Sequence, residues 1–400
     1  MRKKWLLGGL LLLLLSACQP ELIEIEVTRL VERETAADSD METAVPQSGT
    51  RPPTLEPQII EVTRIVTQEV VVEAEAPIEV NASLGSSERP VQLLFPPDAG
   101  TAVINLRGEA VADVLNEATG LEFAIGIADS EQAMIDLMCT APADTIGFLS
   151  SMGYVMANEQ CGVQLGSVAV NSDGLTWQAG MIVARNEQGR RDIEDLEGLR
   201  GAVPDASSLH NATAVKAMLQ KAGVEVEEII EVQGDNAAML AVFEGDVDFA
   251  VGTFTPPIMP DGDEAWQYGV DSNEIWRYLG LEPERSPIGY VLVIAEPEFG
   301  GYRIRDARSG VFDIQPEIFN STRIVELTPQ IPNETVAFGD EFPIGLAHQV
   351  MDELQNFAAS EACIESLCSS DFFNWTGLEP ADEAFYQPLR DIVASGVIDK

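Results

Sequence analysis

Short apolar runs alternate with amphipathic segments along the chain from residue 91 onward. Runs of this length predict buried strands, and apolar residues three and four positions apart predict helices that pack on them. The alternation is typical of βαβ units and a parallel sheet, so the fold class is α/β. In the first half we expect strands over residues 91–95, 121–127 and 145–149, and a helix over residues 108–119.

The expected helices have recognisable ends. Gly120 ends the helix over residues 108–119, because glycine adopts the left-handed conformation of a helix terminus without steric cost. Either Asp129 or Ser130 caps the next helix by accepting a hydrogen bond from its backbone. The apolar face of that helix is expected to carry Ala133, Met134, Leu137 and Met138.

The second half of the chain repeats this order of elements. Strands are expected over residues 181–184, 199–203 and 247–251, with a helix over residues 208–222 and a further helix capped by Asn236. The chain therefore contains two similar α/β lobes, and open α/β sheets bind ligands at the carboxyl ends of their strands. We expect a ligand cleft between the lobes and a hinge made of two strands, near residues 180–183 and 331–336.

The N-terminal residues predict the compartment. Three basic residues at positions 2–4 precede an apolar run that is too short to span a bilayer comfortably, which is the pattern of a secretory signal. The run ends in Leu15-Ser16-Ala17-Cys18, which resembles the cleavage site of bacterial lipoproteins. We expect residues 1–17 to be a signal peptide and Cys18 to carry the lipid that anchors the protein outside the cytoplasm. An ordinary signal peptide with a chance cysteine is the alternative.

Residues 18–88 differ in composition from the rest of the chain. Glu, Val, Thr and Pro dominate, aromatic residues are absent, and the sequence EVTRLV at residues 26–31 recurs as EVTRIV at residues 61–66. Such a segment cannot bury enough surface to offset its ordering entropy, so we expect a low-complexity, disordered tether. The two valine-rich repeats alternate apolar and polar residues, and short strands or pairing with another chain are the alternative.

The acidic composition excludes some partners. A formal net charge of −43, from 23 basic and 66 acidic residues, argues against nucleic acid and against an anionic membrane surface, because both need basic patches. Hydrophobic residues make up 46% of the chain, which is enough for a large core in two lobes.

Four cysteines remain besides Cys18, an even number that predicts two disulfides in an oxidising compartment. They are Cys139, Cys161, Cys363 and Cys368. Three pairings are possible, and we favour the pairing of each cysteine with its nearer neighbour in sequence. A metal site is the weaker interpretation, because neither His210 nor His348 lies at ligand spacing from a cysteine pair. No metal or cofactor is expected.

Several segments share their order and spacing with one known family. They are residues 108–115 (GEAVADVL), 144–155 (DTIGFLSSMGYV), 192–198 (DIEDLEG), 237–248 (AAMLAVFEGDVD) and 386–390 (YQPLR). In this order they resemble the phosphate, phosphite and phosphonate substrate-binding proteins of ABC importers, which have the type 2 periplasmic-binding-protein fold. The resemblance covers about residues 90–253 and 325–400. It implies a monomer that captures a small oxyanion or zwitterion and passes it to an ABC permease.

The resemblance also implies the division into lobes. Lobe 1 is expected to comprise residues 89–180 and 335–400, and lobe 2 residues 181–334. The stretch over residues 255–323 departs from the family pattern and is expected to be an enlarged part of lobe 2.

The family holds its oxyanion at the N-terminus of a helix in lobe 2, which corresponds here to residues 204–211. The candidate ligand residues of this segment are Ser207, Ser208, His210 and Asn211. The first turn of a helix has unpaired N–H groups and a positive dipole end, and serine hydroxyls add neutral donors, so an anion can bind without a lysine. The alternative is that Ser207 or Ser208 only caps the helix.

Lobe 1 is expected to contribute Tyr154, Ser151 and Asp98, although Tyr154 is nearly as well explained as a core residue. Where the family often has a histidine before its Ala-rich helix, this chain has Asp235. A carboxylate there repels phosphate but suits the amino group of a zwitterion, and a helix cap is the alternative. His210 is expected to replace the missing histidine in part.

The sequence bears on two other classes of protein. An enzyme is disfavoured, because the chain has two histidines and no Gly-x-Ser-x-Gly or His-Glu-x-x-His motif. A structural or sensory surface lipoprotein on the same scaffold, with a different ligand or none, is the alternative function. The tether and the divergent stretch over residues 255–323 favour it.

Overall fold

The computed structural model describes residues 84–186 and 189–398. The predicted signal peptide, Cys18 and residues 19–83 of the predicted tether lie outside the described residues. Residues 84–88, the last of that tether, pack on the first lobe, where the Gly85 carbonyl accepts a hydrogen bond from the Glu122 N–H and Leu84 contacts the core. Among the described residues, no helix is long and apolar enough to cross a membrane.

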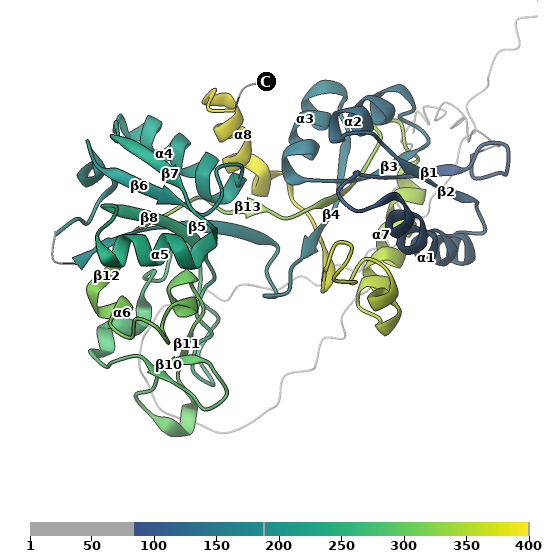
Figure 1. The fold of residues 1–400 in the computed structure, drawn as a ribbon. Coiled ribbons are helices and arrows are strands. Elements are labelled where there is room, and N and C mark those ends of the chain that lie inside the picture. Colours follow the sequence, from purple (N-terminus) through teal and green to yellow (C-terminus); the bar gives the residue numbers. More distant parts are fainter. Residues whose placement is uncertain (1–83, 187–188, 399–400) are drawn as a thin grey trace, which may run out of the picture. The chain divides into compact units, whose positions relative to one another are not determined.

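The first lobe is a mixed sheet with helices on both faces (Figure 1). Its strand order is β15-β4-β14-β3-β1-β2, in which β1 is parallel to β2 and β3 while β14 is antiparallel to β3 and β4. The strands are β1 (Val91–Phe95), β2 (Phe123–Ile127), β3 (Thr145–Leu149), β4 (Gln164–Val170), β14 (Thr335–Phe338) and β15 (Gly377–Pro380). The helices are α1 (Thr101–Thr119), α2 (Glu131–Thr140), α3 (Ser151–Cys161), α7 (Ile344–Ala358) and α8 (Gln387–Ala394).

Burial on both faces of this sheet explains the uninterrupted apolar runs. Successive residues of a strand point to opposite faces, so each face receives every second side chain. Leu93 and Phe95 of β1 pack with α1 and α7, whereas Leu94 packs with α2, α3 and α8. A strand covered on both faces has no polar side, which is why β1 lacks polar alternation.

The second lobe repeats the arrangement with strand order β12-β5-β8-β6-β7. Its strands are β5 (Trp177–Arg185), β6 (Arg200–Val203), β7 (Glu228–Glu231), β8 (Phe249–Phe254) and β12 (Thr322–Leu327). Its main helices are α4 (Ala214–Ala222) and α5 (Gly234–Glu244), and α4 is preceded by the π-helical turn η3 (Leu209–Thr213). Met181 and Val183 of β5 pack with α5, while Ile182 and Ala184 pack with α4. The fold is therefore a two-lobed α/β fold, as predicted.

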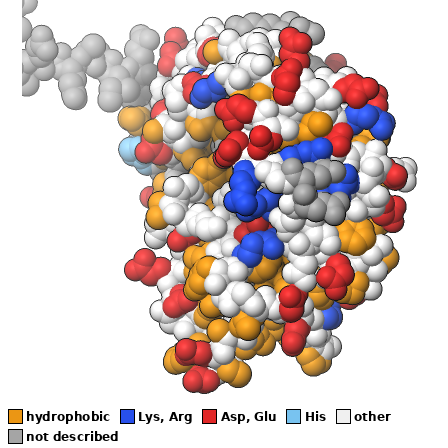
Figure 2. All heavy atoms as spheres, turned by 90° about the vertical axis from the view of Figure 1, so that its left-hand side faces the viewer, with side chains coloured by type: hydrophobic (Ala, Val, Ile, Leu, Met, Phe, Trp, Pro, Cys, Tyr) orange, Lys and Arg blue, Asp and Glu red, His pale blue; other side chains and the backbone are white. Residues whose placement is uncertain are grey.

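Residues 255–323 add a small antiparallel sheet of three strands and the short helix α6 (Ile318–Ser321). The strands are β9 (Glu284–Arg285), β10 (Val291–Val293) and β11 (Tyr302–Ile304). Figure 2 shows hydrophobic side chains gathered toward the lower end of its face, where Figure 1 places this segment. Large hydrophobic side chains that the segment exposes are Ile258, Val270, Tyr278, Leu281, Ile288, Tyr290, Ile294, Phe299 and Ile314.

A buried ion cluster holds this segment together. The Arg308 side chain is fully buried, and its guanidinium pairs with Asp306 at 2.9 Å and with Glu274 at 2.6 Å. Arg277 binds the same Glu274 carboxylate at 2.6 Å, and the Arg308 guanidinium lies over the Phe319 ring. Each buried charge thus has partners of opposite charge, without which its burial would be strongly unfavourable.

Two connections join the lobes: residues 171–176 between β4 and β5, and residues 328–334 between β12 and β14. The second overlaps the hinge predicted near residues 331–336, whereas the hinge predicted near residues 180–183 lies farther along, where β5 is already paired within the second sheet. β13 (Ile331–Pro332) pairs antiparallel with the start of β5. Farther along β5, the Gly180 N–H donates to the Thr328 hydroxyl at 2.6 Å, and the Thr328 N–H donates to the Gly180 carbonyl at 2.9 Å. The outgoing and returning chains are therefore hydrogen-bonded to each other where they pass between the lobes.

The expected elements are present, although several begin elsewhere. Helix α1 begins at Thr101 rather than at residue 108, and Gly108 lies within it, close to Ile125. The prediction that Asn236 caps a helix is wrong, because α5 begins at Gly234 and Asn236 lies in its first turn.

Helices α2 and α3 differ in part from expectation. Ser130 rather than Asp129 caps α2, and its hydroxyl accepts the Ala133 N–H at 3.1 Å. Leu137 was expected on the apolar face of α2 but is 47% exposed, and Ile135 is buried there instead. Ser151 and Tyr154, the ligand residues expected from this part of lobe 1, lie in helix α3, which begins at Ser151.

The favoured disulfide pairing is confirmed. Cys139 bonds to Cys161, and Cys363 bonds to Cys368. The first disulfide joins the carboxyl-terminal ends of α2 and α3, so it fixes these two helices against each other on one face of the first sheet. The second closes a short turn after α7.

Candidate functional site

The segment predicted to hold the ligand lies at the carboxyl ends of two parallel strands of the second lobe. β6 and β8 pair in parallel, so their ends at Val203 and Phe254 lie at the same edge of the sheet. The chain leaves β6 through residues 204–208 and enters η3, which continues directly into α4. Ligand crevices of α/β sheets form at such an edge.

Ser208 begins this helix. Its hydroxyl accepts the Asn211 N–H at 3.3 Å and lies 3.4 Å from His210 Nδ1, so it caps η3 as the sequence predicts. The backbone N–H groups of Leu209 and His210, in the first turn, have no acceptor within residues 84–186 and 189–398. They leave two donors and the positive end of the helix dipole available at this edge.

Asn211 is a buried side chain with unused hydrogen-bonding capacity. It is 3% exposed, its Nδ2 lies 3.5 Å from Thr253 Oγ1, and its Oδ1 has no partner in the described part of the chain. A half-turn of the amide exchanges the two atoms, so the side chain can offer an oxygen to a cation or an N–H to an oxyanion. Buried polar atoms without partners are rare and mark positions where a ligand or water completes the bonding.

The amide also lies directly against the hinge. A Cβ on Gly180 would be 2.7 Å from Asn211 Oδ1 and 2.8 Å from the His210 carbonyl oxygen. Glycine at position 180 is therefore what lets η3 approach β5 closely.

Asp235 and His210 approach the same place from different helices. Asp235 lies in the first turn of α5, and its carboxylate accepts the Thr253 N–H at 3.1 Å. Burial lowers the pKa of His210, while the carboxylates of Asp235 and Asp205 oppose this effect. The structure thus brings His210, Asn211 and Asp235 together around Thr253. Thr253 was not predicted as a site residue, and its only signal in the sequence is its position just after the strand expected over residues 247–251.

The N–H and the hydroxyl of Ser207 are already hydrogen-bonded to a residue of the same loop. It is exposed, and both its N–H and its hydroxyl donate to Asp205 Oδ1, at 2.8 and 2.6 Å. Hydrogen bonds from the Ser207 hydroxyl and N–H hold the pKa of Asp205 below its usual range. A ligand anion that binds Ser207 therefore has to replace Asp205 as the acceptor.

In the first lobe, Tyr154 lies in the core. Its side chain is fully buried on α3 and its hydroxyl donates to Glu383, which also pairs with Arg390 at 2.8 Å. Burial, followed by the hydrogen bond to Glu383, raises the pKa of Tyr154. Ser151 is the first residue of α3 and is buried, whereas Asp98 is exposed in the loop between β1 and α1.

Apolar contacts connect the start of η3 with the first lobe. Leu209 packs against the cluster that contains Tyr154 and Leu389. Farther along, Ala217 of α4 and Ile392 of α8 belong to one buried cluster. The predicted ligand segment of the second lobe and helix α3 of the first lobe therefore contact the same group of side chains.

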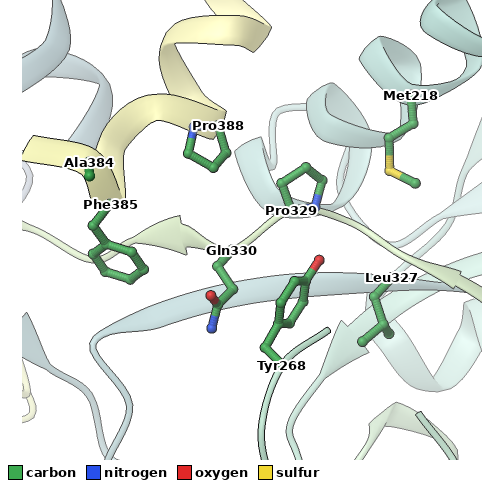
Figure 3. Close-up of a pocket in the computed structure, with 8 residues that line it drawn as sticks. All are labelled: Met218, Tyr268, Leu327, Pro329, Gln330, Ala384, Phe385 and Pro388. Carbon is green, nitrogen blue, oxygen red and sulfur yellow. The ribbon is translucent and has the colours of Figure 1, made fainter. Parts of the chain in front are cut away.

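A pocket of about 360 Å³ lies beside the hinge (Figure 3). The pocket is lined by α4, by the chain that returns to the first lobe, by the enlarged segment and by the residues around the start of α8. The lining residues are Met218, Tyr268, Leu327, Pro329, Gln330, Ala384, Phe385 and Pro388. Burial, with the Glu326 carboxylate, raises the pKa of Tyr268 to about 12, and its hydroxyl donates to the Thr328 carbonyl at 2.7 Å. The predicted ligand residues are not among its described lining residues, so this apolar pocket is distinct from the candidate site.

Acidic side chains dominate the face in Figure 2, and basic ones gather near its centre. Arginines of the described part that form ion pairs with carboxylates are Arg89, Arg107, Arg190, Arg200, Arg277, Arg285, Arg305, Arg308 and Arg390. The donors at the candidate site are backbone N–H groups, serine hydroxyls and the Asn211 amide. Within the described residues no cluster of three or more potential metal ligands is found.

Comparison with known proteins gives one family. The family model described as the periplasmic substrate-binding protein of a phosphonate ABC transporter matches residues 93–386. No curated protein matches the chain in sequence.

Solved structures similar to this one share little sequence with it. A Xanthomonas citri protein bound to a chloride ion is 14% identical over 76% of this chain and 96% of its own, with a TM-score of 0.43. The binding-protein component of an ABC phosphonate transporter from Pseudomonas aeruginosa is 13% identical, over 76% and 85%, with a TM-score of 0.38. PhnD1 from Prochlorococcus marinus, in complex with methylphosphonate, is 13% identical, over 76% and 97%, with a TM-score of 0.37.

Proposed function

Because the chain belongs to the family of periplasmic substrate-binding proteins of phosphonate ABC transporters, we propose that it captures a small phosphorus oxyanion or a zwitterionic phosphonate between its two lobes. The family consists of transport proteins rather than enzymes, and its members act with an ABC permease outside the cytoplasm. The proposal concerns the ligand and the residues that hold it.

One observation carries the proposal. At the carboxyl ends of β6 and β8, the first-turn N–H groups of Leu209 and His210 have no acceptor in the described part of the chain, and they lie beside the buried amide of Asn211, whose oxygen has no partner there either. Aligned N–H groups at a helix start stabilise a negative ligand group, and the neutral amide adds a directional hydrogen bond without a desolvated charge. A phosphonate group has three oxygens that can accept hydrogen bonds from such donors.

The remaining predicted residues take defined roles in this proposal. Ser207 and Ser208 donate hydroxyls to the oxyanion, and His210 lies beside them. Asp235 accepts an amino group where the ligand carries one, and its carboxylate is already oriented by the Thr253 N–H. The first lobe contributes Ser151, Tyr154 and Asp98. Tyr154 contacts the ligand only if its hydroxyl donates to the ligand in place of Glu383.

The hinge supplies the mechanism. The β5 connection and the returning chain at residues 328–334 let the lobes close on the ligand, and closure excludes water from the polar groups around it. Cys18 carries a lipid that keeps the protein at the membrane, close to its permease, and the protein acts as a monomer.

Thermal unfolding of the full chain tests the proposal. Melting temperatures are recorded with phosphate, phosphite, methylphosphonate, 2-aminoethylphosphonate and a set of solutes without phosphorus. A ligand at a hundred times its Kd stabilises the protein by about 2.7 kcal/mol, which raises the melting temperature by a few degrees at this size.

A matched pair of variants locates the site. Replacing both Ser207 and Ser208 by leucine abolishes the shift while the protein still melts cooperatively, whereas Ser370→Leu, in an exposed turn of the first lobe after α7, keeps it. An unchanged shift in the double variant contradicts the site. If no solute changes the melting temperature of the native chain, a structural or sensory lipoprotein explains the protein better than a transport component does. The exposed hydrophobic side chains of residues 255–323 would favour that function.

A further inference from the structure

We propose that residues 255–323 form a strap that restrains the hinge: they are bound to both connections between the lobes, and they thereby set the angle between the lobes. The inference goes beyond the proposed function, because it concerns the hinge and holds for any ligand that binds between the lobes.

Tyr268 binds the strap to the connection that returns to the first lobe. Its hydroxyl donates to the Thr328 carbonyl at 2.7 Å, and Figure 3 shows Tyr268 beside this part of the chain. Thr328 is fully buried, and its N–H and its hydroxyl are both hydrogen-bonded to Gly180 of β5. The Tyr268 ring also packs edge-to-face on Trp177 at the start of β5, with the ring centroids 5.9 Å apart. Tyr268 therefore contacts the hinge where the outgoing and returning chains are hydrogen-bonded to each other.

Arg305 binds the strap to the connection that leaves the first lobe, residues 171–176. Its Nη1 lies 3.3 Å from Asp173 Oδ1, and its Nε donates to the Pro256 carbonyl at 2.9 Å. The Arg305 side chain is 18% exposed, and burial lowers its pKa while the Asp173 carboxylate opposes this effect. A guanidinium that is largely removed from water needs such a partner, so the ion pair is favoured over two separate charges.

The turn that carries Asp173 is fixed to the first lobe. Thr376, which precedes β15 of the first sheet, donates its hydroxyl to the Asn171 carbonyl at 2.7 Å and its N–H to the Val170 carbonyl at 2.8 Å. Within the turn, Asn171 Oδ1 accepts the N–H groups of Asp173 and Leu175 at 3.0 and 3.1 Å. The ion pair between Arg305 and Asp173 therefore joins the second lobe to the first.

Contacts between the lobes lie on both faces of the second sheet. The strap packs with α5 on the face that receives Met181 of β5, whereas α4 covers the face that receives Ile182. On the α4 face, Ala217 packs with Ile392 of α8 in the first lobe. Because β5 leads directly from the hinge, a rotation of the lobes that separates the contact on one face presses the contact on the other face together. The ion pair of the strap thus resists the rotation that the contact between α4 and α8 does not resist.

A purely local role for the ion pair makes a different prediction. If the pair only steadies the turn over residues 171–176, its loss changes this turn and leaves the angle between the lobes as it was. If the pair is part of a strap, its loss lets the lobes adopt angles that the native chain rarely adopts. The distribution of distances between the lobes is therefore the decisive quantity.

Pulsed electron paramagnetic resonance of the full chain measures this distribution. The spin labels are carried by non-natural amino acids in place of exposed Glu109 in α1 and exposed Glu244 in α5, one in each lobe. Arg305→Gln is expected to raise the population outside the main native peak about threefold to fivefold, which is the change in an equilibrium that an ion pair of up to about 1 kcal/mol produces.

Matched variants separate the ion pair from a general effect of charge. Asp173→Asn removes the same pair from the side of the turn and is expected to give the same change, and the double variant with Arg305→Gln is expected to add little to either single change. Arg285→Gln removes an equal charge from a pair inside the strap, with Asp313 at 2.6 Å, and is expected to keep the native distribution. High salt, which screens the partly exposed pair, should bring the native chain closer to Arg305→Gln.

Each outcome supports or overturns the strap. If Arg305→Gln and Asp173→Asn both keep the native distribution, residues 255–323 do not restrain the hinge and the inference is wrong. Equal broadening in Arg285→Gln overturns it as well, because loss of charge alone then explains the change. Should Arg305→Gln not fold, Asp173→Asn, in an exposed turn, decides the question by itself. The measurement needs no ligand, so a failure of the proposed function leaves its result unaffected.

Discussion

A single methyl group at the hinge tests whether the candidate site depends on the close approach of η3 to β5. In Gly180→Ala the new Cβ would lie 2.7 Å from Asn211 Oδ1, 2.8 Å from the His210 carbonyl oxygen and 3.2 Å from Thr328 Cγ2. The amide can rotate, but the carbonyl belongs to the backbone of η3, so η3 has to move away from β5. Overpacking of this kind costs about 1–3 kcal/mol. Alanine also lowers the conformational entropy of the unfolded chain, which stabilises the folded state by at most about 1 kcal/mol. We therefore expect the unfolding free energy to fall by about 1–2 kcal/mol in total.

Two measurements check this expectation. Urea denaturation gives the unfolding free energy, and titration with the tightest ligand of the melting-temperature panel gives the affinity, which should fall at least about tenfold because Asn211 and the first-turn N–H groups are displaced together. Gly345→Ala is the control, since a Cβ on this helical glycine would meet nothing within 4 Å. If Gly180→Ala matches Gly345→Ala in both stability and affinity, the close packing of η3 on the hinge has no role.

Three further perturbations address the rest of the fold. Arg308→Met leaves the buried Asp306 carboxylate without its ion-pair partner and Glu274 with Arg277 alone, and it should lower the unfolding free energy measured in urea by about 3–5 kcal/mol. Arg200→Met breaks an exposed pair and should lower it much less, so equal losses would contradict the buried cluster. Because burial lowers the pKa of His210, the unfolded chain binds the proton more tightly, so stability rises with pH between the folded-state pKa and about 6.5. Denaturation curves at several pH values should show that His210→Gln removes this rise of stability with pH. The control His348→Gln, at an exposed position, should keep it. A rise that persists in His210→Gln would show that another group causes it. Double serine substitution that removes the Cys139–Cys161 disulfide should lower the unfolding free energy by about 3 kcal/mol. Removing the Cys363–Cys368 disulfide should lower it by about 2 kcal/mol, because the two disulfides close loops of 22 and 5 residues. A larger loss for Cys363–Cys368 would show that chain entropy is not the main effect.

Several strands were predictable from the sequence because both faces of their sheet are buried, whereas β4, β7, β12 and β15 were not predicted. β1 and β3 read as apolar runs for this reason, and their predicted bounds agree with the structure. The start of α1 was not predictable in the same way. Between Thr101 and Gly108 only Ile104 is buried before the glycine, and Leu106 is 63% exposed, so the first two turns show no apolar face.

Only part of the candidate site could likewise be predicted from the sequence. Ser208, His210 and Asn211 follow from a local pattern, a cap and a first helical turn after a strand, and the structure places them there. The partner of the Tyr154 hydroxyl, Glu383, lies 229 residues away in sequence, and the partner of Ser150, Glu131, lies 19 residues away. Side-chain contacts over such distances depend on how helices pack, which hydrophobic periodicity does not specify.

Calorimetric titration of Asn211→Leu tests whether the Asn211 amide binds the ligand. Leucine has nearly the shape of asparagine and removes a buried amide whose oxygen has no partner, so the free protein should keep or gain stability, since an unpaired buried polar atom costs about 1–3 kcal/mol. Asn158→Leu, near the far end of α3 where the amide donates to the Val163 carbonyl, is the matched control. The account predicts that Asn211→Leu folds at least as stably as the native chain and binds the phosphonate at least about tenfold more weakly, while Asn158→Leu keeps the native affinity. Native affinity in Asn211→Leu would contradict the account and place the ligand elsewhere.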